Sequence, residues 1–153
     1  MSAEKRVKEL GLDLPQLWPA GGNYVPGVRT GNLLYMSGCG PRRKDGSYIT
    51  GKLGETATLE QGYEAARQTG LNMLVNIRHV LGSLDKVVRV VKVLGMVNAS
   101  PQFSEPPKVI NGFSDLFVEV FGENGRGARS AVGMATLPNQ MAVEVEMILE
   151  VAD

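Results

Sequence analysis

The sequence predicts a single α+β domain in which helices cover one face of a mixed sheet. Two segments, 59–81 and 108–121, carry apolar residues at helical spacing, and a β-branched run, 87–97, separates them. Paired strand signals lie near each end of the chain. The chain has 153 residues, which suits one core better than two independent ones. The predicted order is therefore hairpin, helix, strand, helix, hairpin, giving two βαβ-like halves around one sheet.

Residues 1–22 are predicted to form an N-terminal extension, with the domain proper at 23–153. Ser2 can cap a short helix through Leu10, and Gly11 can end it. A loop follows, in which Trp18 is the one large side chain. We expect Trp18 to pack against the body of the protein, with an interface or lid role as the alternative.

The first predicted strand pair is 24–29 and 33–37, joined through Thr30-Gly31-Asn32, a typical hairpin signal. The basic run 42–46 is interpreted as a solvated loop, because it is too short to bind nucleic acid without support elsewhere. The Gly-rich segment 51–58 lacks the Gly-Lys-Ser/Thr end of a phosphate-binding loop, so we assign it no nucleotide role.

The predicted long helix 59–81 has Thr58 as its cap and Glu60 in its first turn, and it should lie across the sheet. The run 87–97 is apolar on both parities, which favours a central strand. The second helix, 108–121, should pack on the same face of the sheet. One sheet face is then left uncovered, and an exposed apolar face normally indicates oligomerisation.

The segment 126–150 is predicted to form two paired strands that turn at 137–140, where a Pro-Asn pair suits the central positions. If that turn is even-numbered, Arg129 shares one sheet face with Glu144 and Glu146. An odd-numbered loop would move every one of these side chains to the other face. Taken alone, an arginine near glutamates on a strand is more often a structural ion pair than a site.

Composition excludes several classes of function. Lys plus Arg equals Asp plus Glu, so no net charge attracts nucleic acid or an anionic membrane. Cys39 is the single cysteine, which excludes an internal disulfide, and no cluster has the spacing of a zinc site. His79, the single histidine, is expected to be a surface or packing residue. The charged N-terminus precedes no apolar stretch of signal-peptide or membrane-span length, so we expect a cytoplasmic protein.

Two separated motifs resemble the Rid family, the reactive intermediate deaminases also called the YjgF family. The C-terminal motif consists of Ala128 to Gly133, Leu137-Pro138 and Val143 to Glu146. The N-terminal motif consists of Asn23 to Gly27 and Gly31 to Gly38. The resemblance covers about Tyr24 to Val151, and the intervening elements occur in the same order.

The resemblance implies a chorismate-mutase-like fold, assembly into homotrimers, and ligand sites in clefts between subunits. It also implies an enamine/imine deaminase that hydrolyses reactive 2-imino acids to 2-oxo acids and ammonia. No cofactor or metal is expected, because imine hydrolysis is already favourable and only its rate requires help.

The resemblance also implies roles for individual residues. Arg129 matches the arginine that binds the substrate carboxylate, since a planar two-pronged donor suits that group. Glu144 matches the glutamate that orients the attacking water. The remaining matches are expected to bind substrate: Tyr24, the backbone at Ser37 and Gly38, and, more loosely, Asn111.

Two site positions depart from the family pattern. Ala131 replaces a frequent cysteine, and Cys39 replaces a polar residue that commonly lines the site. We expect Cys39 to be a buried small hydrophobe rather than a reactive thiol. These departures, with the N-terminal extension, indicate a divergent branch. They leave open a non-enzymatic module that binds a small carboxylate metabolite, and an endoribonuclease ranks last because basic and aromatic residues do not interleave.

Overall fold

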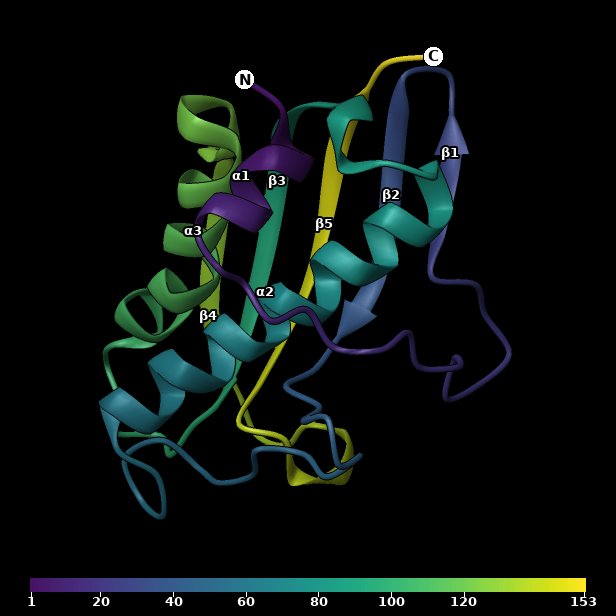
Figure 1. Cartoon of the computed structure of the whole chain (residues 1–153). Helices are drawn as coiled ribbons and strands as arrows, with labels where there is room; N and C mark the ends of the chain where they lie inside the picture. Colours follow the sequence, from purple (N-terminus) through teal and green to yellow (C-terminus); the bar gives the residue numbers. More distant parts are fainter.

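The computed structural model describes all 153 residues as five strands and three α-helices, with short 3-10 turns between them (Figure 1). The helices are α1 (Ala3–Glu9), α2 (Leu59–Leu81) and α3 (Pro106–Phe121). The strands are β1 (Gly27–Thr30), β2 (Leu33–Cys39), β3 (Val87–Asn98), β4 (Ala128–Met134) and β5 (Val143–Val151).

The long helix begins and ends at the predicted residues. Thr58 caps α2 through a reciprocal pair of hydrogen bonds with Gln61, and Gly82 follows in a left-handed conformation at φ 83°. Helices α2 and α3 cross the same face of the sheet, as Figure 1 shows. Their apolar sides, with the facing side chains of the sheet, form one core. The predicted α+β architecture with helices on one sheet face is confirmed.

The strand order corrects one prediction. The sheet runs β1-β2-β5-β3-β4, so β3 lies between the two C-terminal strands, and the predicted hairpin of β4 and β5 is wrong. β3 pairs in parallel with β4 and antiparallel with β5. The physical reason is the length and apolar character of β3, which favour a central position with two partners. Between β4 and β5 the chain makes a 3-10 turn, Pro138–Gln140, and β3 lies between these two strands in the sheet.

The register corrects a second prediction. Arg129 lies opposite Val93, which lies opposite Met147, and the latter two are buried beneath the helices. Arg129 is therefore on the helix-covered face. Glu144 and Glu146 have the other parity on β5 and lie on the uncovered face. The prediction that Arg129 shares a sheet face with Glu144 and Glu146 is therefore wrong for a single chain.

Helices α2 and α3 approach closely at Gly112. A Cβ on Gly112 would fall well inside contact distance of the Tyr63 carbonyl oxygen on α2. Because the neighbouring atoms belong to the backbone, one of the two helices would have to move to relieve the clash, which costs more than the movement of a side chain. We expect Gly112→Ala to lower the free energy of unfolding by about 3 kcal/mol or more, measured by urea denaturation.

Gly70→Ala is the matched control for this prediction. Gly70 lies on α2 at the same interface, but its added Cβ would meet the tip of the Leu116 side chain, at 2.7 Å. A flexible side chain can shift, and alanine favours helix over glycine by about 1 kcal/mol. Equal decreases in the free energy of unfolding of the two variants would contradict close backbone packing at Gly112.

The predicted N-terminal helix is confirmed as α1, with Ser2 as its cap. Glu4 ties it to the domain: its carboxylate accepts from Arg78 at 3.0 and 2.6 Å and from the Leu84 amide at 2.9 Å. Arg78 accordingly holds the pKa of the Glu4 carboxyl below its ordinary value. Helix α1 therefore packs firmly on the rest of the chain, and its Ala3 and Val7 belong to the same core. The first strand is shorter than predicted, because Tyr24 to Pro26 lie in the preceding loop.

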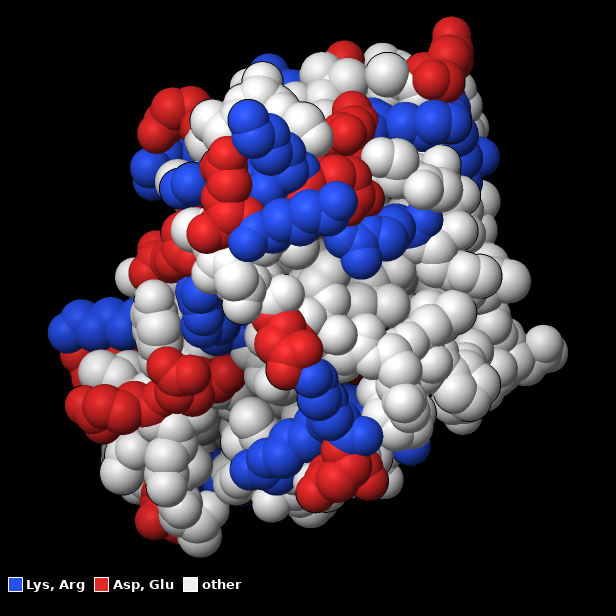
Figure 2. All heavy atoms as spheres, viewed as in Figure 1, with Lys and Arg blue, Asp and Glu red and all other residues white.

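The two sheet faces differ in their surfaces. On the helix side, Figure 2 shows basic and acidic side chains intermingled over the surface. On the other side no element covers the sheet, and apolar side chains are exposed there: Val28 at 56%, Tyr35 at 45% and Val132 at 40%. None of the helices is long and apolar enough to cross a membrane.

Candidate functional site

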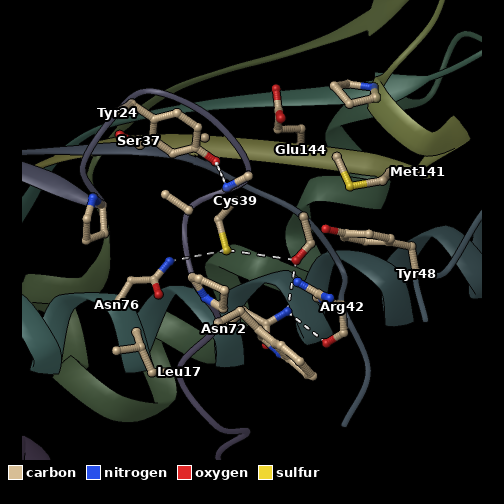
Figure 3. Close-up of a pocket in the computed structure, with 18 of the residues that line it drawn as sticks. Leu17, Tyr24, Ser37, Cys39, Arg42, Tyr48, Asn72, Asn76, Met141 and Glu144 are labelled. Carbon is tan, nitrogen blue, oxygen red and sulfur yellow. Dashed lines mark hydrogen bonds between the residues drawn. The ribbon is translucent and has the colours of Figure 1, made fainter. Parts of the chain in front are cut away.

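A cavity of about 730 Å³ opens at the edge of the sheet beside the end of β2. Its walls come from the loop 16–21, the end of β2, helix α2 and the turn before β5 (Figure 3). Five of the predicted site residues line it: Tyr24, Ser37, Gly38, Cys39 and Glu144.

The opening arises from irregular pairing of β2. The short β1 pairs with β2 only as far as Met36, and the pairing of β2 with β5 shifts between Met36 and Cys39. Ser37 turns to the N-terminal loop instead, donating its hydroxyl to the Val25 carbonyl at 2.6 Å. A bulge of this kind re-aims side chains and backbone at a sheet edge. Here it leaves Ser37 and Gly38 facing the cavity.

Glu144 lies against this bulge with its carboxylate free. A Cβ on Gly38 would lie 3.1 Å from the Glu144 carboxyl carbon, so glycine leaves the room that the carboxylate occupies. No protein group donates a hydrogen bond to it. Burial raises the pKa of the half-buried Glu144 carboxyl above its ordinary value, and the charge of Glu146 adds to this. Such a carboxylate can accept a proton from water more readily than an exposed one.

Cys39 is buried, as expected. Its sulfur makes only long contacts, to the Gly40 carbonyl at 3.8 Å, the Thr69 carbonyl at 3.9 Å and the Asn76 amide at 3.8 Å. Burial, together with the neighbouring Glu144 charge, raises the pKa of the Cys39 thiol to about 12. The thiol therefore stays protonated at neutral pH and is a poor nucleophile.

Arg129 lies in a second, smaller pocket of about 200 Å³ on the helix side. It donates to the Asn111 side-chain oxygen at 2.9 Å, to the Ser114 hydroxyl at 3.1 Å and to the Pro107 carbonyl at 3.2 Å. These bonds use three of its five N–H groups and leave Nε and one Nη2 hydrogen without a partner. That edge of the guanidinium has the geometry of a two-pronged carboxylate donor. Burial lowers the pKa of Arg129 from its ordinary value.

The structure thus divides the predicted site residues between two places. Asn111 and Arg129 are brought together, whereas Glu144 lies with the residues of β2 in the larger cavity. Ala131 lines neither pocket and packs against the core. The catalytic and substrate-binding roles of these residues stay predictions.

The sequence analysis did not single out Ser114, Asn72 or Asn76, and it expected His79 to be only a surface or packing residue. Ser114 is three residues after Asn111 on α3, so both face Arg129. Asn72, Asn76 and His79 occur at helical spacing on α2 and line the larger cavity together. The spacing of these polar residues on an otherwise apolar helix face is the signal that could have found them. No group of three or more His, Cys, Asp or Glu side chains could hold a metal ion.

Comparison with known proteins agrees with the fold and the motifs. Residues 4–151 match the family described as "YjgF/chorismate_mutase-like, putative endoribonuclease". The chain belongs to this YjgF family. The mixed sheet and the three helices of this YjgF-family protein form the chorismate-mutase-like fold of the family.

Individual relatives support the assignment. Protein TCP17 of Trypanosoma cruzi is 44% identical over 145 residues, covering 94% of this chain and 91% of the relative. The crystal structure of Atu1372 from Agrobacterium tumefaciens, described as of unknown function, is 42% identical with a TM-score of 0.87, covering 98% and 92%. RidA from the Antarctic bacterium Psychrobacter sp. PAMC 21119 is 28% identical with a TM-score of 0.60, covering 90% and 94%.

Proposed function

We propose that this YjgF-family protein is an enamine/imine deaminase that hydrolyses 2-imino acids to 2-oxo acids and ammonia. The observation that carries the proposal is Glu144, a half-buried carboxylate with a raised pKa and no protein hydrogen-bond donor, placed beside the exposed bulge of β2. Natural proteins rarely leave a buried carboxylate without a donor unless it has a chemical role. A cytoplasmic location fits this reaction and stays a prediction.

In the proposed reaction, Glu144 holds a water molecule beside the imine carbon. The water oxygen bonds to that carbon while one of its protons passes to the Glu144 carboxylate. The carbon–nitrogen double bond becomes single, and Glu144 passes the proton to the nitrogen, which gives a carbinolamine. Glu144 then takes the proton of the new hydroxyl and delivers it to the nitrogen as the carbon–nitrogen bond breaks and the carbonyl forms, so ammonia leaves and a 2-oxo acid remains. Atoms and charges balance without a cofactor.

Arg129 is the proposed anchor for the substrate carboxylate, through its free Nε and Nη2 hydrogens. Asn111 and Ser114 hold it in position. Because Arg129 and Glu144 lie on opposite faces of one sheet, a second copy has to bring its arginine to the Glu144 cavity. The uncovered face offers the apolar side chains for such an assembly, and we propose the homotrimer that the family resemblance implies.

Arg129→Ala is expected to lower kcat/KM for imine hydrolysis about 100-fold, because the substrate loses a charged two-pronged partner. The assay follows ammonia release from imino acids generated in situ by an amino-acid oxidase. Arg126→Ala is the matched control: Arg126 also lines the smaller pocket, but it is exposed and paired with Glu123. A rate unchanged in Arg129→Ala would refute the anchor.

The alternative proposal is a non-enzymatic module that binds small carboxylates in the same cavity. The departures at Cys39 and Ala131 favour it, since both differ from the family's usual site residues. Saturable binding of 2-oxo acids by the purified protein, with no ammonia release above the spontaneous rate, would support the module over the enzyme.

A further inference from the structure

The basic run at 42–44 is not uniformly solvated, which corrects its interpretation as a plain surface loop. Arg43 donates to the Tyr48 carbonyl at 3.1 Å and Lys44 pairs with Asp13. These two side chains serve the loop and the N-terminal segment. Arg42 differs, because its half-buried side chain lines the larger cavity.

Aromatic rings hold the Arg42 guanidinium in place. Its central carbon lies 3.9 Å from the centroid of the Trp18 ring and 5.4 Å from that of Tyr48. Its Nε donates to the Gly46 carbonyl at 3.1 Å. Figure 3 shows Arg42 beside Tyr48 in the cavity wall. The guanidinium is therefore oriented before any ligand binds, so little freedom is lost when one does.

The terminal nitrogens of Arg42 have no partner in the chain. Its one donated side-chain hydrogen bond comes from Nε, and no carboxylate lies within ion-pair distance. Both Nη groups remain available, and together they present the planar fork that a carboxylate fits. An oriented cation without a counter-charge is unusual for a structural arginine.

A second observation indicates that this end of the cavity is incomplete. Trp18 Nε1 and Asn72 Oδ1 are buried and have no hydrogen-bond partner, and both residues line the cavity. Asn72 is 5% exposed, and its amide nitrogen already donates to the Gly40 and Arg42 carbonyls. Buried polar atoms are almost always paired in native proteins. A ligand with its ordered water would supply the missing partners.

We propose that Arg42 is an anion subsite that binds a second carboxylate, carried on the side chain of the substrate. The preferred substrates are then 2-imino dicarboxylic acids. This inference rests on the proposed function, in which Arg129 binds the first carboxylate and Glu144 acts at the imine carbon. We call Trp18, Tyr48 and the Gly46 carbonyl, which together hold the Arg42 guanidinium, the clamp. Because Trp18 belongs to the N-terminal segment, this segment contributes to the specificity for the second carboxylate.

The test compares two stable 2-oxo acids by titration calorimetry. 2-Oxoglutarate carries a second carboxylate, and 5-methyl-2-oxohexanoate carries an isopropyl group in its place. Wild-type protein is expected to bind 2-oxoglutarate at least about tenfold more tightly. Arg42→Gln should remove this preference by weakening the binding of 2-oxoglutarate alone, because the isopropyl end of the monocarboxylic acid makes no ionic contact with Arg42. Trp18 is the single tryptophan, so 2-oxoglutarate should also change its emission in the wild type.

Arg43→Gln is the matched control, since it removes the same charge from the neighbouring position and should keep the preference. Arg42→Lys keeps the charge without the fork and should lose most of the preference, which covers the case that Arg42→Gln folds poorly. No preference in the wild type, or a preference that survives in both Arg42 variants, would overturn the subsite. If the Arg42 effect appears but Arg129→Ala changes neither affinity, the subsite stands and the proposed role of Arg129 fails.

Discussion

Replacing Glu144 with glutamine is expected to remove imine hydrolysis while making the fold more stable. Glutamine has nearly the same shape as glutamate but cannot take a proton from water, so we expect kcat to decrease by a factor of about 10² to 10⁴. Measurement of ammonia release under saturating substrate tests the first part. Thermal unfolding of the two proteins at neutral pH tests the second.

The stability gain follows from the raised pKa of Glu144 in the folded state. Folding favours the protonated carboxyl, so its contribution to stability is present below the ordinary pKa and is lost as pH rises through the raised one. At neutral pH the wild type holds an ionised, half-buried carboxylate, whereas the glutamine variant does not. The variant should therefore have the higher Tm at neutral pH, and the difference should shrink in acid.

The same pKa shift sets the acid limit of activity. Wild-type activity should decline as pH falls through the raised pKa of Glu144, at a higher pH than for an ordinary glutamate. Glu146→Gln is the control. The Glu146 charge is the second cause of the raised pKa of Glu144, so the variant should have a lower acid midpoint and retain turnover. A glutamine variant at position 144 that keeps the wild-type rate would contradict this role.

Local sequence was sufficient for the helices and the central strand. Thr58 and Gly82 mark the two ends of α2, and each of these capping signals depends on only a few neighbouring residues. The pairing of β4 with β3 could not be predicted from local sequence, because β4 and β5 are joined by a short link and therefore resemble a hairpin. A better indication was that β3 has apolar residues on both of its faces, which is typical of a strand with a partner on each side.

The candidate site was predictable to a similar degree. The motif resemblance pointed to Glu144, Arg129 and the backbone at Ser37 and Gly38. It gave no sign of the bulge there, nor of the position of Arg129 on the other face of the sheet. The clamp around Arg42 was hidden, because Trp18 is distant in sequence and reaches it only when the N-terminal loop folds over the cavity. Long-range contacts of single side chains leave no periodic signal.

Mixing two inactive variants is expected to restore activity if the site is shared between subunits. An Arg129→Ala chain retains Glu144, and a Glu144→Gln chain retains Arg129. In a closed trimer assembled at random from equal amounts, about one site in four receives both intact residues from neighbouring chains. We therefore expect about a quarter of the wild-type activity after joint unfolding and refolding, although each variant alone is nearly inactive.

The control replaces the Arg129→Ala chain with the double variant Arg129→Ala/Glu144→Gln, which cannot supply Glu144 to any site. This mixture should stay inactive, which excludes recovery caused by refolding itself. The measurement that tests the shared imine-hydrolysing site most directly is ammonia release by the first mixture. Recovery to about one quarter is the expected result for a closed trimer, and activity no higher than that of the separate variants would contradict a site built from two chains.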